Sequence, residues 1–220
     1  KKGKTVQGIL EKAISKALKS KIKIIGSGRT DTGVNASGQS ANFYCNQKIK
    51  NSFKFLSSLN FFLKKYPISV INIKLRSSNF HARHSAKKRQ YQYVILNRLA
   101  KPSIDKNKVW FVVKKLDFIK MKKAISFFRG THNFSAFRAS SCSAKSPIRK
   151  ISYANMKKKN DKIFINFESK SFLQKQVRSM VGCLKYVGEK KWNPSQIKKI
   201  IKSKKEKTAL LQLHLKGFFL

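Results

Sequence analysis

Hydrophobic residues recur every three or four positions in several stretches of the chain, a spacing typical of helices that bury one face. The clearest example runs from about Thr5 to Ser20, with apolar residues at Val6, Ile9, Leu10, Ala13, Ile14, Ala17 and Leu18. The same spacing predicts helices over residues 51–65, 117–128 and 172–187. A further helix is expected to begin at Asn193 and Pro194, because an N-cap residue followed by proline is a common helix start.

Other stretches alternate apolar and polar residues, as half-buried strands do. This pattern predicts strands over 21–25, 41–45, 68–75 and 89–97, and a hairpin formed by 149–156 and 162–168. The apolar end of the chain, residues 217–220, is typical of a strand cut short and is expected to be packed. Helices and strands interleave throughout, which indicates a mixed α/β or α+β fold.

Composition adds a strong charge to this picture. The 220 residues are 41 % hydrophobic, enough for a buried core, and carry a formal net charge of +43. Such a charge favours a polyanionic partner such as nucleic acid, although lysines scattered over every segment could also reflect a compositional bias of the source. Only nine of the 51 basic residues are arginine, so each arginine suggests a place where a planar, two-pronged cation is needed.

The sequence contains neither a membrane span nor a recognisable signal peptide, and no membrane partner is expected. Its three cysteines are too widely spaced to suggest a disulfide framework or a metal motif. We therefore expect a soluble, cytoplasmic protein in a reducing compartment.

Residues 26–39, GSGRTDTGVNASGQ, follow a predicted strand and are the best candidate for chemistry. The segment could simply be a glycine-rich turn, and its glycines do not match a phosphate-binding loop. Asp31 is nevertheless notable, because Glu11 is the only other acid in the first hundred residues and is expected to face solvent on its helix. Arg29, two positions away, could keep the Asp31 carboxylate ionised and oriented.

Several reaction classes do not fit such an acid-poor chain. Glycoside hydrolysis normally needs two carboxylates, and metal-dependent phosphoryl transfer needs carboxylates to hold its ions. The four histidines show no metal-binding spacing, His81 and His84 being more typical of a structural or RNA-facing pair, and no GxSxG motif is present. A Ser/His/Asp triad is not excluded by residue order, but the remaining option is a lone aspartate acting as nucleophile or base on a bound nucleotide.

Four blocks of the sequence resemble the TruA family of tRNA pseudouridine synthases. GRTDTGVNASGQ at 28–39 is similar to the family's GRTDAGVHAxGQ, and FHARHSAKKRQYQY at 80–93 is similar to FHARFSAxxRxYxY. GTHNFSAFRASSC with SPIRKI at 130–151 resembles GTHDFxSF…R, and FLQKQVRSMVG at 172–182 resembles FLxxMVRxxVG. A weaker fifth match lies at the C-terminus.

The resemblance implies that the chain isomerises uridine to pseudouridine in the anticodon stem-loop of tRNA, at positions 38, 39 and 40, without cofactor or metal. It implies that Asp31 is the catalytic aspartate, that Arg178 pairs with it and that Tyr91 packs on the target uracil. From the residues alone, the favoured interpretation of Tyr91 is a core residue of its strand. Arg178 lies in an otherwise apolar helix and needs a partner, for which Asp31 is suitable. Arg29, Arg83 and Arg89 are candidates for phosphate contacts.

The family resemblance also implies a fold of two α/β lobes, with mixed, largely antiparallel sheet and flanking helices, around a basic catalytic cleft. We expect an N-terminal lobe over residues 1–78, carrying the aspartate loop, and a C-terminal lobe over residues 79–220. By analogy the protein is a homodimer whose protomers share one tRNA.

The chain departs from the family pattern at Thr32 and Asn35, where the family has Ala and His. The sequence also opens directly on the first helix, without the family's opening strand before it, which is expected of either a fragment or a reduced homologue. Loss of that strand would expose a sheet edge and weaken folding or RNA binding. Two alternatives therefore stay open: a catalytically inactive, truncated RNA-binding relative, and a DNA- or ribosome-binding structural protein favoured by net charge alone.

Overall fold

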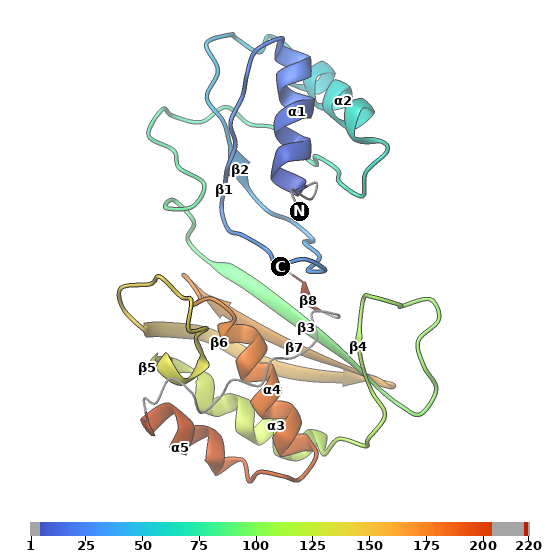
Figure 1. The fold of residues 1–220 in the computed structure, drawn as a ribbon, viewed down its shortest axis with the longest axis vertical. Coiled ribbons are helices and arrows are strands. Elements are labelled where there is room, and N and C mark those ends of the chain that lie inside the picture. Colours follow the sequence, from blue (N-terminus) through green and yellow to red (C-terminus); the bar gives the residue numbers. More distant parts are fainter. Residues whose placement is uncertain (1–4, 204–217, 220) are drawn as a thin grey trace. The chain divides into compact units, whose positions relative to one another are not determined.

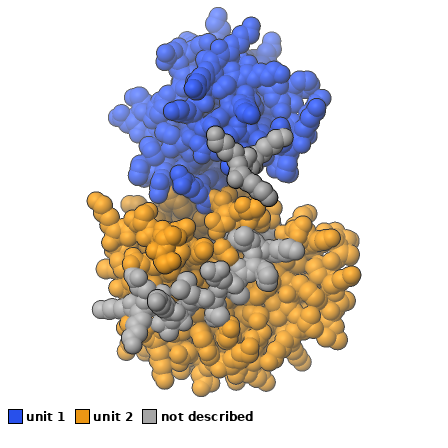
Figure 2. Space-filling model, in the orientation of Figure 1, with its two compact units in different colours: residues 1–29, 39–86 blue, residues 30–38, 87–220 orange. Residues whose placement is uncertain are grey.

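The computed structural model describes residues 5–203 and 218–219, which form two compact units (Figure 2). Unit 1 comprises residues 1–29 and 39–86, and unit 2 comprises residues 30–38 and 87–220. The short segment 30–38, which contains Asp31, thus groups with the second unit although unit 1 precedes and follows it in the sequence. The predicted lobes, divided at residues 78 and 79, stay a prediction, as does the basic cleft between them.

Unit 1 is built on two helices that the apolar spacing predicted, α1 (Val6–Leu18) and α2 (Ser52–Leu63). The Thr5 hydroxyl accepts a hydrogen bond from the backbone N–H of Gly8 and so caps α1, and the Asn51 side chain caps α2 in the same way through Lys54. The buried side chains of the two helices pack together with two residues of the segment that follows α1. This core consists of Ala13, Ile14, Leu18, Ile22, Ile24, Phe55, Leu59 and Leu63.

The predicted strands 21–25 and 41–45 are much shorter in the structure. Only β1 (Ile25–Gly26) and β2 (Ala41–Asn42) pair, in an antiparallel two-stranded sheet. Side chains of α1 take the place of a strand neighbour, because Ser15 Oγ accepts from Ile22 N at 2.9 Å and Glu11 Oε1 accepts from Ile24 N at 3.0 Å. The prediction that Glu11 faces solvent was therefore wrong.

The predicted strand over 68–75 was also wrong, since no strand is assigned there. The Asn60 side chain accepts from the N–H of Val70 at 2.8 Å and donates to its carbonyl at 2.9 Å. One amide from α2 thus satisfies both backbone groups of Val70, as a neighbouring strand would otherwise do. Ile68, Val70 and Ile73 still pack against the core of unit 1, which explains the apolar pattern.

Unit 2 contains a six-stranded mixed sheet (Figure 1). Its main path runs β4 (Trp110–Val112), β3 (Arg89–Asn97), β7 (Lys162–Ser169), β6 (Ile148–Lys159) and β5 (Gly130–Asn133). Only the β3–β4 pair is parallel, and β8 (Phe218–Phe219) pairs with β3 antiparallel, as the apolar chain end predicted. The predicted hairpin is confirmed and is longer than expected, because its strands continue to a tight turn at Asn160 and Asp161.

Three helices cover one face of this sheet: α3 (Phe118–Ile125), α4 (Gln176–Gly188) and α5 (Ser195–Ser203) (Figure 1). Two short 3₁₀ helices, Ser126–Phe128 and Ser135–Phe137, complete the layer. The main core lies between helices and sheet, and a smaller cluster lies on the sheet's other face, formed by Val94, Leu96 and Val109 with Phe111 and Phe164. The expected mixed α+β architecture, with largely antiparallel sheet and flanking helices, is confirmed and agrees with the pseudouridine synthase fold.

Helix α4 begins later than the apolar pattern predicted. Lys175 adopts a left-handed conformation with φ 61°, so regular helix starts only at Gln176. Gln176 is fully buried, and its side-chain oxygen accepts from the N–H of Leu173 at 2.8 Å. Phe172 therefore lies on the segment leading into the helix, and not on the helix itself.

Candidate active site

Asp31 lies at the first position of a tight turn in unit 2. The N–H of Val34 donates to the carbonyl of Asp31 at 3.1 Å, and Gly33 between them has φ 83°. This left-handed conformation favours glycine at the third position of such a turn, because other residues have a Cβ that crowds the backbone. The Val34 side chain packs against the core of unit 2, so the turn carrying Asp31 is anchored on its C-terminal side.

Arg178 reaches this turn from the first part of α4. Its Nη1 atom donates to Asp31 Oδ2 at 3.1 Å, which joins residues 147 positions apart in the sequence. The Arg178 side chain is only 13 % exposed, whereas that of Asp31 is 49 % exposed. The guanidinium is thus held by its surroundings, and the carboxylate keeps a face open to an incoming molecule.

Tyr91 lies in the first half of β3, on the sheet face that bears the main core. Its ring contacts that of Phe172 edge to face, with ring centroids 5.0 Å apart and an interplanar angle of 83°. Burial raises the pKa of the Tyr91 hydroxyl; the nearby Arg89 guanidinium opposes that shift and the Asp31 carboxylate adds to it. The charges of Arg89 and Asp31 therefore both act on the Tyr91 hydroxyl.

The predicted arginines divide between the two units. Arg89 lies two residues before Tyr91 on β3, and its Nη1 atom donates to the carbonyl of Lys170. Arg29 and Arg83 belong to unit 1, where both are exposed. Unit 2 alone thus brings together Asp31, Arg178, Tyr91 and Arg89.

Phe172 is the site residue that sequence reasoning missed. Its apolar character was assigned to the stripe of a helix that actually begins four residues later. No periodic signal separates it from the buried residues that follow. A sequence pattern could have found it only through its place at the start of the fourth matching block.

This arrangement suits attack on an electrophilic carbon beside a flat, unsaturated ring. A half-exposed carboxylate oriented by a guanidinium can act as nucleophile or base, and an aromatic ring supported by a second aromatic ring can receive a planar group. The described residues contain no group of three or more His, Cys, Asp or Glu that could hold a metal ion. Within the same residues, no helix is long and apolar enough to cross a membrane.

Comparison with known proteins agrees with this chemistry. A family model described as tRNA pseudouridine synthase matches residues 124–218. A protein of Pelagibacter ubique (strain HTCC1062) named tRNA pseudouridine synthase A is 51 % identical over 219 residues, covering 100 % of this chain and 89 % of the relative. A protein of the same name from Erythrobacter litoralis (strain HTCC2594) is 36 % identical over 201 residues, covering 91 % of this chain and 81 % of the relative.

Proposed function

The chain belongs to the tRNA pseudouridine synthase A (TruA) family, and we propose that it converts uridine to pseudouridine at positions 38, 39 and 40 of the tRNA anticodon stem-loop. Family membership makes it an isomerase acting on tRNA uridine. The anticodon site follows from the resemblance of the four sequence blocks, and the roles of individual residues follow from that resemblance together with the geometry in unit 2.

The reaction breaks the bond between N1 of uracil and C1′ of the ribose, and forms a bond between C5 and C1′. The C5 proton is lost and N1 gains a proton, so atoms and electrons balance without an oxidant, a reductant or water. In the proposed mechanism Asp31 either attacks C1′ directly or assists departure of the base. Arg178, whose side chain is mostly buried on α4, orients the carboxylate through its hydrogen bond to Oδ2.

The target base must leave its stack in the RNA before C1′ can be reached. We propose that the displaced base packs on the ring of Tyr91. This ring meets that of Phe172 edge to face, with centroids 5.0 Å apart, and the Asp31 charge acts on its hydroxyl. Arg29, Arg83 and Arg89 are proposed to contact phosphates, which position the RNA without reading its sequence. By resemblance to the family we also propose a cytoplasmic homodimer whose protomers share one tRNA.

The hydrogen bond between Arg178 and Asp31 is the observation that carries the assignment of Asp31. A transcribed, unmodified tRNA with uridines in the anticodon arm provides the test, with pseudouridine mapped by chemical labelling and primer extension. Product is expected at positions 38 to 40, and is expected to vanish at each position where cytidine replaces uridine. Product confined to another arm would refute the anticodon assignment, and tight binding without product would indicate the inactive RNA-binding relative.

A further inference from the structure

The helix α2 carries phenylalanine on the face that points away from its own core. Phe55, Leu59 and Leu63 recur every four residues and are buried. At 100° per residue, Phe53 and Phe61 fall on the opposite side of the helix. They are 75 % and 62 % exposed, so they contribute little to the packing of unit 1. Two large exposed aromatic side chains on one helix face call for a partner.

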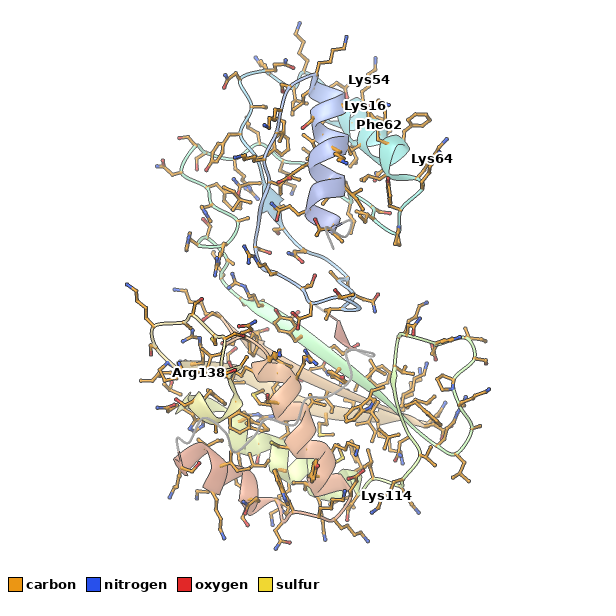
Figure 3. The ribbon with its side chains drawn as sticks, viewed as in Figure 1. Lys16, Lys54, Phe62, Lys64, Lys114 and Arg138 are labelled. Atoms are coloured by element: carbon orange, nitrogen blue, oxygen red, sulfur yellow. The ribbon has the colours of Figure 1, made fainter. Side chains whose placement is uncertain are left out.

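Lysine ammonium groups lie over the aromatic rings of this helix. Lys64 Nζ is 4.6 Å from the centroid of the Phe61 ring, and Lys16 Nζ of α1 is 4.7 Å from that of Phe62. The rings of Phe61 and Phe62 themselves meet edge to face at 5.8 Å. Figure 3 shows Lys16, Phe62 and Lys64 along these two helices. We call Phe53, Phe61, Phe62, Lys16 and Lys64 the α2 surface.

The charge of unit 1 restricts what this surface can bind. Its residues include 17 Lys or Arg but a single acid, Glu11. One carboxylate offsets only one of these cations, so unit 1 keeps a large positive charge. A second copy of this chain would bring the same positive charge to the contact. The fitting partner is an anion that also presents flat, apolar rings.

We propose that the α2 surface binds unpaired nucleotides of RNA, with Phe53 and Phe61 stacking on bases while Lys16 and Lys64 contact phosphates. Single-stranded nucleic acid is commonly held by this combination of aromatic platforms and basic side chains. Phe53 and Phe61 are eight positions apart, which is about 12 Å along the helix axis and leaves room for bases a few nucleotides apart. The contact uses no residue of the Asp31 site, and it requires only that the chain bind RNA.

Stacking can be separated from phosphate attraction with two oligonucleotides of equal charge. A fluorescent 12-nucleotide oligouridine and an abasic strand of the same length carry the same phosphates, but only the first carries bases. The measurements use the Tyr91→Ala background, which removes the ring proposed to receive the target base. In this background we expect the chain to bind oligouridine more tightly than the abasic strand. The Phe53→Ser/Phe61→Ser variant should lose about tenfold in affinity for oligouridine and little for the abasic strand.

Two further variants sharpen this experiment. The Lys16→Gln/Lys64→Gln variant should weaken binding of both strands equally, because both carry the same phosphates. The Ile71→Ser/Leu75→Ser variant is the matched control, since these side chains of unit 1 are 76 % and 97 % exposed but are not aromatic. It should bind both strands like the parent chain. Circular dichroism checks that each variant is folded.

Equal affinity of the parent for the two strands, or unchanged oligouridine binding by the Phe53→Ser/Phe61→Ser variant, would overturn the proposal. Binding to phosphatidylserine vesicles is measured in parallel. If the Phe53→Ser/Phe61→Ser variant lost only this vesicle binding, the surface would be assigned to a membrane and the proposal would be overturned. The Phe53→Ser/Phe61→Ser variant is also made without the Tyr91→Ala change. At saturating tRNA it should retain the full rate of pseudouridine formation. A failure here is therefore distinguishable from a failure of the proposed reaction.

Discussion

Replacing Arg178 by methionine tests how far the guanidinium supports the Asp31 carboxylate. Methionine keeps an unbranched apolar side chain in the partly buried site but removes the charge and every N–H donor. At the observed 3.1 Å, Coulomb's law gives about 5 kcal/mol with an effective dielectric constant of about 20, and about 1 kcal/mol in water. Because Asp31 is 49 % exposed, we expect a value near 2 kcal/mol, which is typical of a charged hydrogen bond.

A loss of about 2 kcal/mol in the transition state lowers the rate constant roughly 30-fold. The assay is single-turnover release of tritium from tRNA labelled at C5 of uridine, since that hydrogen leaves when C5 bonds to C1′. Arg98→Met is the control, because Arg98 forms a similar pair with Asp161 at 3.6 Å elsewhere in unit 2. It should react at the parent rate. An Arg178→Met rate within about twofold of the parent would refute the argument that this pair orients the carboxylate.

Three other substitutions test neighbouring parts of the structure. Gly33→Val forces a β-branched residue to φ 83°, and should cost about 1–3 kcal/mol locally and lower the single-turnover rate, while Gly38→Val should do neither. Phe172→Leu removes the edge contact with Tyr91 and should lower the same rate about twofold to tenfold; an unchanged rate would contradict the bracing role. Burial raises the pKa of the Glu189 carboxyl, but the hydrogen bond from Lys185 and the nearby Lys191 ammonium together lower it by more, so the net pKa is below its ordinary value. The stability that this carboxylate contributes is therefore present at pH values above the ordinary carboxyl pKa, and it is lost as the pH falls through the lowered pKa. The melting-temperature deficit of Glu189→Gln should accordingly be present at pH 7 and shrink in acid.

Local patterns predicted the elements whose hydrogen bonds follow regular helix or sheet rules. Strand β3 was predicted with its observed bounds, because Tyr91, Tyr93 and Ile95 alternate along it and neighbours on both sides complete its ladder. The segment 68–75 shows a similar apolar pattern but bonds to the Asn60 side chain instead of a strand. Alternation records which side chains are buried, and it cannot say what satisfies the backbone.

The candidate site depends on contacts that no local pattern contains. Arg178 and Asp31 lie 147 positions apart, so their pairing was expected only from family resemblance and from the need of a charge in an apolar helix for a partner. The position of Phe172 depends on the left-handed Lys175, where regular helix is interrupted. A lysine at that conformation has no distinctive sequence signal, and the predicted helix therefore began too early.

The most direct test of the proposed chemistry is a paired measurement on the parent chain and Asp31→Asn. Asparagine keeps the size of the side chain and can still accept from Arg178, but it cannot supply a carboxylate to C1′. Pseudouridine formation in the anticodon arm and the dissociation constant for tRNA are measured on the same preparations. We expect product with the parent chain, none with Asp31→Asn, and similar tRNA affinity for both. Product from the variant, or an equal loss of binding and turnover, would contradict the assignment of Asp31 as the catalytic carboxylate.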